Sequence, residues 1–230
     1  MRVLTTLALL FAVCHVASAN IVINGTRVIY RSSSKETTVQ LINTGTSPSL
    51  VQSWIDDGDI DSTPETAHVP FLLTPPVIKV AGGGGQQLLI KKLPSSLPGD
   101  RESVFYLNVL DIPPVPENMV GKNTIQLAVK SRIKIFYRPQ TLAAGADKGI
   151  ELMRVEHSAR TFTLHNASPY FITIANIMNA RDNKLLKDPV MVAPFSTLSA
   201  PSLMPINSGD KYKLLYVDDL GAYKTHRLIP

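Results

Sequence analysis

Cysteine is almost absent from this chain of 230 residues, in which Cys14 is the only one. A single cysteine excludes an intramolecular disulfide framework and a metal site built from several cysteines. Charged residues are also few, at 18% of the chain, whereas hydrophobic residues make up 44%. This balance is typical of a globular protein, and it excludes a disordered or collagen-like chain.

Long apolar runs are missing beyond the N-terminus, so we expect no membrane span, which needs about 20 such residues. The one marked run follows Met1 and Arg2, extends over residues 3–16, and leads into Ala17-Ser18-Ala19. A short basic start, an apolar centre and an A-x-A site are typical of a secretory signal peptide. We therefore expect residues 1–19 to be a signal peptide cleaved after Ala19. The product would be a soluble, exported, cysteine-free chain that begins at Asn20.

Patterns of catalytic and metal sites are lacking as well. The histidines are scattered, and no nucleophile motif or metal-ligand spacing surrounds any of them. Residues 57–61 imitate the start of a calcium loop, but Ser62 and His68 stand where glycine and glutamate are required. The net charge is +5, yet no dense basic cluster with interleaved aromatic residues indicates nucleic-acid binding. We expect no catalytic residues, no metal, no cofactor and no nucleic-acid partner, and hence a protein that is not an enzyme.

What the chain does contain is a series of short stretches rich in β-branched and aromatic residues, separated by turn residues. Such punctuation at intervals of about 8–12 residues predicts an all-β sandwich or barrel. The expected strands are 36–43, 49–55, 86–91, 103–110, 125–137, 150–155, 160–166, 170–178, 190–192, 211–217 and 224–229. Residues 138–147 are rich in alanine and glycine and lack a strand pattern, which favours a linker. We therefore expect two β-sandwich domains, at 20–139 and 140–230.

Three segments together point to a family. They are Thr26-Arg27-Val28-Ile29-Tyr30, residues 93–114 (LPSSLPGDRESVFYLNVLDIPP) and residues 124–139 (TIQLAVKSRIKIFYRP). In combination they resemble the periplasmic pilus chaperones of the chaperone–usher pathway in Gram-negative bacteria, most strongly up to Pro139. The resemblance implies two immunoglobulin-like β-sandwich domains arranged as a boomerang, with a subunit-binding cleft between them. The short, cysteine-free loop at 115–123 resembles the short-loop subfamily.

The function that the resemblance implies is chaperoning without catalysis. A member of this family binds, folds and caps fimbrial (pilin) subunits in the periplasm by donor-strand complementation, and delivers them to an outer-membrane usher. Arg27 and Lys134 match the two cations that bind the C-terminal carboxylate of the subunit in this family. Two cations that converge on a carboxylate form charge-assisted hydrogen bonds of about 1.5–3 kcal/mol each.

A second implied element is the apolar row Ile125, Leu127 and Val129. Alternation alone predicts that this row faces the sandwich core. The family implies instead that it faces outward and supplies the strand that a pilin lacks. An exposed apolar row is prone to aggregate, which leads to the hypothesis that the free chaperone caps itself or dimerises. The row occupies odd-numbered positions and Lys134 an even-numbered one, so an unbroken strand would place them on opposite faces. We therefore expect a bulge or a strong twist near residues 130–132.

Three further residues, Glu102, Arg138 and Asp219, match an ion-pair network between the domains of the family. Such a network would fix the angle between the domains, although an exposed ion pair adds little stability. Two other functions stay open at this point. The chain could be a structural fimbrial subunit or another exported β-sandwich binding protein, although its N-terminal region lacks the long alternating extension of a subunit.

Overall fold

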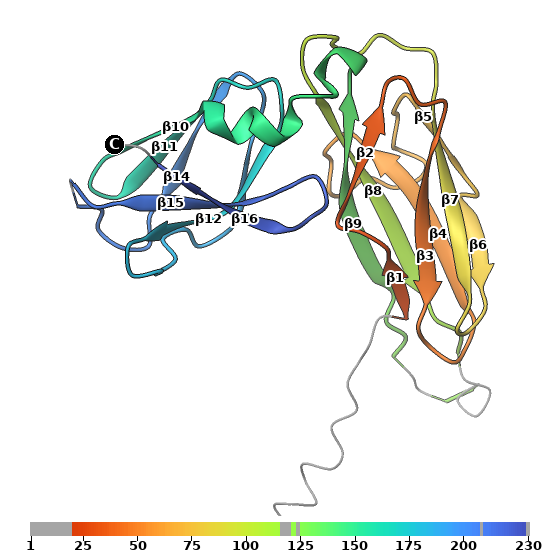
Figure 1. The fold of residues 1–230 in the computed structure, drawn as a ribbon. Helices are drawn as coiled ribbons and strands as arrows, with labels where there is room; N and C mark the ends of the chain where they lie inside the picture. The colour runs from red at the N-terminus through yellow and green to blue at the C-terminus, as the bar shows by residue number, and fades with distance from the viewer. Residues whose placement is uncertain (1–19, 116–120, 123–124, 208, 229–230) are drawn as a thin grey trace, which may run out of the picture.

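The computed structural model describes residues 20–115, 121–122, 125–207 and 209–228, and the predicted signal peptide lies outside them. Within this part the chain is almost entirely β-structure, arranged as two sandwiches that meet at an angle (Figure 1). The all-β fold class predicted from the strand pattern is therefore confirmed. Nothing that could span a membrane as an apolar helix occurs in the described ranges.

The first sandwich is built from two sheets that face each other. Its strands are β1 (Ile21–Ile23), β2 (Arg27–Arg31), β3 (Thr37–Asn43), β4 (Ser49–Asp56), β5 (Phe71–Thr74), β6 (Val77–Val80), β7 (Gly85–Lys92), β8 (Ser103–Ile112) and β9 (Val129–Arg138). One sheet has the order β1-β3-β7-β5, and the other has the order β2-β9-β8-β4-β6. Side chains alternate along each strand, so every second residue points into the space between the sheets. The buried residues Val39 and Leu41 of β3 thus meet Leu107 and Ile135 of the opposite sheet in one core.

The second sandwich repeats this arrangement with its own core. Its strands are β10 (Met153–His157), β11 (Thr161–Asn166), β12 (Ile172–Asn179), β13 (Val190–Val192), β14 (Ser196–Pro201), β15 (Tyr212–Val217) and β16 (Tyr223–Arg227). The sheet β10-β11-β14 packs on the sheet β13-β12-β15-β16. Phe162 and Leu164 from one sheet and Ile174 and Leu214 from the other are fully buried between them.

Two short 3₁₀ helices connect the sandwiches, η2 (Gln140–Leu142) and η3 (Ala146–Leu152). The stretch predicted to be a linker, residues 138–147, contains no strand beyond Arg138, but η2 and the start of η3 lie within it. Tyr170 holds this connection against the second sandwich, because its hydroxyl donates a hydrogen bond to the carbonyl of Leu142 at 2.7 Å. Gly149 allows the close approach, since a Cβ there would lie 2.9 Å from the Tyr170 ring.

The strand predicted at 125–137 begins four residues later than expected, at Val129. Its partner β8 ends at Ile112, and the next residues are Pro113 and Pro114. Proline has no backbone N–H and cannot extend a ladder, so the residues before Val129 have no β8 partner.

Of the two alternatives expected near residues 130–132, a bulge or a strong twist, the bulge is absent from β9. The β8–β9 register runs without a shift from Asp111 opposite Val129 to Ser103 opposite Tyr137. Val129 and Lys134 therefore lie on opposite faces of β9, as unbroken alternation requires. The core-facing side includes Ile133, Ile135 and Tyr137, and Lys134 lies on the outer side.

Candidate functional site

Arg27 and Lys134 lie on neighbouring strands at the same level. The parallel pairing of β2 and β9 places Arg27 directly opposite Lys134. The next residues on each strand, Val28 and Ile135, are buried in the core of the first sandwich. By alternation the two cations therefore point to the outer face of the sheet.

The surroundings of Arg27 hold its guanidinium at the junction of the two sandwiches. One guanidinium nitrogen donates a hydrogen bond to the carbonyl of Val217 at 3.3 Å, and the group lies 5.8 Å from the centre of the Phe136 ring. Its Nε is buried and has no hydrogen-bond partner among the described residues. Gly221 permits the β15–β16 turn to lie here, because a Cβ would be 2.2 Å from the Thr26 hydroxyl.

Neither cation of this pair forms an ion pair within the described residues. Burial, followed by the nearby positive charges of Arg27 and Arg132, lowers the pKa of Lys134. Burial also lowers the pKa of Arg27, although the negative charges of Asp219, Asp218 and Glu102 oppose this effect. Two half-buried cations side by side are an arrangement that an anion stabilises.

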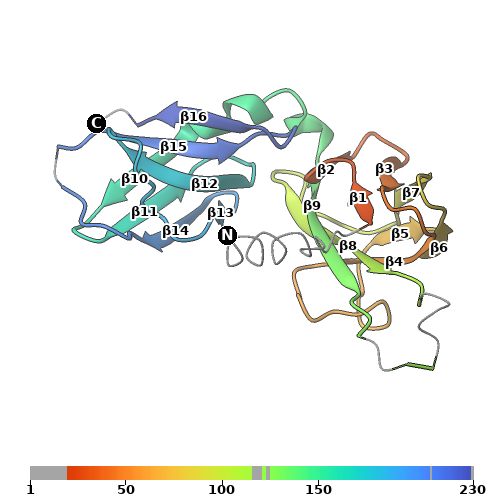
Figure 2. The same cartoon turned by 90° about the horizontal axis from the view of Figure 1, so that it is seen from below.

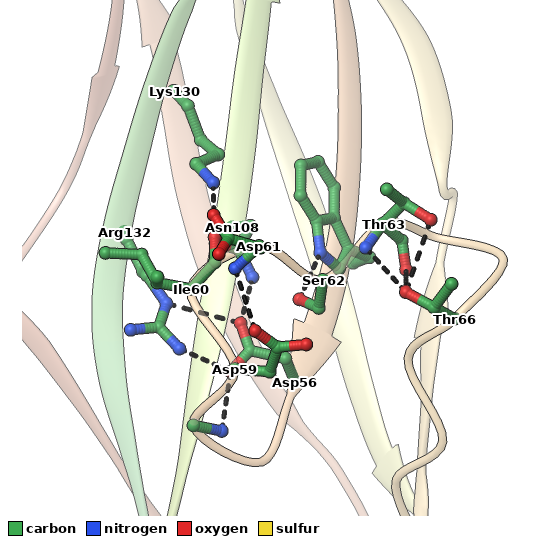
Figure 3. Close-up of polar contacts among 12 residues, drawn as sticks. Asp56, Asp59, Ile60, Asp61, Ser62, Thr63, Thr66, Asn108, Lys130 and Arg132 are labelled. Carbon is green, nitrogen blue, oxygen red and sulfur yellow. Dashed lines mark hydrogen bonds and ion pairs between the residues drawn. The ribbon is translucent and has the colours of Figure 1, made fainter.

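Arg132, the next basic residue on the outer face of β9, is held differently. Its guanidinium forms a two-point ion pair with Asp56 (Figure 3). The same group stacks 3.8 Å from the centre of the Tyr106 ring. Asn108 donates a third hydrogen bond to Asp56 at 2.6 Å, and the backbone N–H of Gly58 donates a fourth at 2.7 Å. Burial works against ionisation, but the hydrogen bonds from Arg132, Asn108 and Gly58 lower the pKa of Asp56.

The Asp56 cluster was not predicted from the sequence. Asp56 stands at the start of an acidic stretch that reads as a surface turn, whereas its side chain is almost fully buried. The chain after Asp56 folds over the outer face of the sheet, where Lys130 donates to the carbonyl of Ile60 at 2.8 Å and Trp54 donates to the hydroxyl of Ser62 at 3.2 Å (Figure 3). Arg132 is thereby fixed and neutralised, whereas the adjacent cations Arg27 and Lys134 form no ion pair among the described residues.

Glu102, Arg138 and Asp219 are brought together between the sandwiches. Arg138 Nε donates to Glu102 at 2.6 Å, and its two terminal nitrogens donate to the carboxylate of Asp219 at 2.6 and 2.9 Å. Glu102 also accepts the backbone N–H of Phe171 at 2.8 Å. Burial raises the pKa of Glu102 despite the opposing charge of Arg138, and the two acids raise the pKa of Arg138 although burial opposes this.

These three residues also line a cavity of about 360 Å³ at the junction. Its wall includes Arg27 and Phe136 from the first sandwich and Tyr216 and Leu220 from the second, so both domains contribute to one concave surface. Figure 2 shows the junction from below, with the β15–β16 hairpin of the second sandwich reaching toward β2 and β9.

The apolar row is exposed in the structure. Ile125 is 90% exposed, Leu127 68% and Val129 40%, and only Val129 lies inside β9. The prediction from alternation alone, that the row is core, does not describe Ile125 and Leu127. Among the residues that the structure describes, one edge of β9 is open as well, since β2 pairs only with residues 134–138 and residues 129–133 have no partner on that side.

Comparison with known proteins identifies the class to which this arrangement belongs. Residues 20–143 match the family described as "Pili and flagellar-assembly chaperone, PapD N-terminal domain", and residues 146–228 match "Pili assembly chaperone PapD, C-terminal domain". The two matches cover most of the chain, which therefore belongs to the PapD-like family of pilus assembly chaperones. The family membership inferred from three short segments is confirmed, and the alternative of a structural fimbrial subunit is set aside.

Individual relatives agree with this assignment. The chain is 40% identical over 220 residues to the probable fimbrial chaperone YehC of Escherichia coli, covering 96% of this chain and 91% of that protein. It is 36% identical over 206 residues to the chaperone protein MrkB of Klebsiella pneumoniae, covering 88% of each. The crystal structure of the Pseudomonas aeruginosa CupB2 chaperone superposes with a TM-score of 0.77 at 32% identity, covering 90% of this chain and 98% of that one.

Proposed function

We propose that this chaperone binds fimbrial subunits through Arg27 and Lys134, completes their open sheet with the segment around Ile125, Leu127 and Val129, and delivers them to an outer-membrane usher from the periplasm. The observation that carries the proposal is the pairing of Arg27 with Lys134, two half-buried cations that form no ion pair among the described residues. A terminal carboxylate supplies the missing negative charge and accepts hydrogen bonds from both groups.

The open edge of β9 indicates where the subunit strand pairs and in which direction it runs. A subunit strand that pairs with residues 129–133 would occupy the position that β2 occupies farther along β9. If its final carboxylate reaches Arg27 and Lys134, the strand must run toward Lys134, that is, parallel to β9. The backbone ladder supplies affinity, and the side chains of the row enter the apolar groove of the subunit.

Opposite faces of β9 can therefore serve one ligand without a bulge. The carboxylate meets Lys134 on the outer face at the end of the bound strand, whereas the apolar row acts through the other face, farther from the anchor. Each apolar side chain fully buried in the subunit contributes roughly 1.5–3 kcal/mol. The exposure of Ile125 and Leu127 in the free chain also supports the prediction that the unoccupied chaperone dimerises or caps itself.

The proposal is tested by moving the carboxylate of the subunit. A fimbrial subunit encoded beside this chaperone is exported together with it, either with its natural C-terminus or with two residues, Gly-Ser, added to that end. We expect the natural subunit to co-purify with the chaperone and the extended one to be lost, because its carboxylate no longer reaches Arg27 and Lys134. Equal recovery of both subunits would show that Arg27 and Lys134 do not bind the C-terminal carboxylate of the subunit.

A further inference from the structure

Asp111 is a carboxylate in a position where the strand pattern calls for an apolar residue. It follows Phe105, Leu107 and Val109 on the core-facing side of β8, all of which are buried, and it is itself only 5% exposed. A carboxylate that leaves water needs hydrogen-bond donors and a compensating positive charge.

In the chain that still carries residues 1–19, the hydrogen-bond donors around Asp111 are all neutral groups. The backbone N–H groups of Asn20 and Ile21 both point to Asp111 Oδ2, at 3.1 and 3.2 Å, and the Ser49 hydroxyl donates to Oδ1. No lysine, arginine or histidine pairs with Asp111 anywhere in the described ranges. A buried negative charge thus lies against a backbone nitrogen without a cation.

The position of that nitrogen is fixed by the turn between β3 and β4. The carbonyl of Asn20 accepts the backbone N–H of Thr44 at 2.7 Å and the Thr44 hydroxyl at 3.2 Å. Gly45 leaves room for the Asn20 side chain, since a Cβ there would lie 2.6 Å from its amide oxygen. Asn20 is therefore held in place from both sides, and its nitrogen faces the carboxylate.

We propose that Asp111 is the binding site for the α-ammonium group that removal of the signal peptide creates at Asn20. Hydrolysis of the Ala19–Asn20 bond by an export peptidase adds the hydroxyl of water to the carbonyl carbon of Ala19 and a proton to the nitrogen of Asn20. An α-amino group with its ordinary pKa near 8 is protonated at neutral pH. A neutral amide donor 3.1 Å from Asp111 is thereby replaced by a cation at the same place.

This ion pair ties β1 across the sandwich to the sheet that contains β8. It lies where β8 ends and where Asp111 faces Val129, the first residue of β9. The exported and processed chain thus gains an interaction that the precursor lacks. The inference rests on cleavage after Ala19 and is independent of the carboxylate-binding proposal.

The test measures the pKa of the α-amino group in the purified, exported protein by NMR, after its mass has shown where the chain begins. The contacts of Asn20 and Asp111 come from Thr44, Gly45 and Ser49, none of which titrates, so Asp111 is the charged group that faces the amine. We expect a pKa about one unit or more above the ordinary value, since one unit is a tenfold preference for the charged form. Stability from this pair is then full below about pH 8 and is lost as pH rises through the raised value.

Two variants and one control make the result specific. Asp111→Asn removes the negative charge, and insertion of one glycine between Ala19 and Asn20 moves the ammonium away while Asp111 stays intact. Both should return the α-amino pKa to its ordinary value, whereas Ser49→Ala removes only a neutral donor and should leave it raised. An ordinary pKa in the wild-type protein, or a mature chain that starts at a residue other than Asn20, overturns the proposal.

Discussion

Arg27 and Lys134 are direct partners in the parallel ladder between β2 and β9, and their side chains share the outer face of that sheet. Like charges at such close range destabilise a fold unless an anion compensates them. Arg132, one alternation step before Lys134, has its compensation in Asp56, and Arg138 has two acids. The contrast supports the proposal that Arg27 and Lys134 bind the carboxylate of a subunit.

Removing either cation should abolish capture of the subunit and leave the chaperone folded. Each charge-assisted hydrogen bond contributes about 1.5–3 kcal/mol, so Arg27→Ala or Lys134→Ala should weaken binding roughly tenfold to a hundredfold. Co-purification with a subunit measures the loss, and urea unfolding checks the fold. Arg31→Ala is the matched control, because Arg31 lies on the same strand and face but is exposed and away from the pair. Normal binding by both variants would contradict the assignment.

A charge placed in the apolar row should block donor-strand pairing. Leu127→Glu would bury an unpaired carboxylate in the groove of the subunit, which costs several kcal/mol, so the complex should be lost. Because Leu127 is 68% exposed in the free chain, the unfolding midpoint should hardly change. Ala128→Glu places the same charge on the other side of the segment, and we expect it to bind far better. A Leu127→Glu protein that fails to fold would identify Leu127 as a core residue instead.

In the ion-pair network between the domains, removal of Glu102 should lower the free energy of unfolding more than removal of Asp219. Glu102→Ala leaves the buried Nε of Arg138 and the N–H of Phe171 without their acceptor, while Asp219 still pairs with the guanidinium. We therefore expect the free energy of unfolding to fall by about 1–3 kcal/mol for each of the two unsatisfied groups. The side chain of Asp219 is 45% exposed, and Asp219→Ala should cost about 1 kcal/mol or less. Urea unfolding measures both losses. Small-angle scattering should show a changed domain angle for Asp219→Ala, and equal stability losses would refute the ranking.

Most of the strands could be predicted from local patterns in the sequence. Strands such as Thr37–Asn43 and Val190–Val192 lie where alternation and turn residues predicted them, because each buries one face in a core. The short strands Phe71–Thr74 and Val77–Val80 were not predicted, since each has only four residues, which give too little alternation to recognise. The start of β9 was misplaced because it depends on where the partner strand meets Pro113, which is a tertiary constraint.

For the candidate site, too, some residues could be predicted from the sequence and others could not. Arg27 and Lys134 could be named from motifs, but their shared level and face depend on pairing between strands more than 100 residues apart. Asp56 and Asp111 were not predicted, because an aspartate beside a turn or at the end of a strand normally faces water. Only the packing of other elements over them shows that Asp56 fixes Arg132 and that Asp111 meets Asn20.

Acid should weaken the fold in part through Asp56. Hydrogen bonds from Arg132, Asn108 and Gly58 hold the pKa of Asp56 below its ordinary value, although burial opposes this. The stability that it contributes is therefore full above the unfolded pKa, about 3.9, and is lost as pH falls through the lower folded value. In urea unfolding from pH 6 down to pH 2, the gap in stability between wild type and Asp56→Asn should narrow below about pH 4. Asp57→Asn, which changes the exposed neighbour, should follow the wild-type curve, and a gap that stays constant over this range would show that Asp56 does not contribute through its charge.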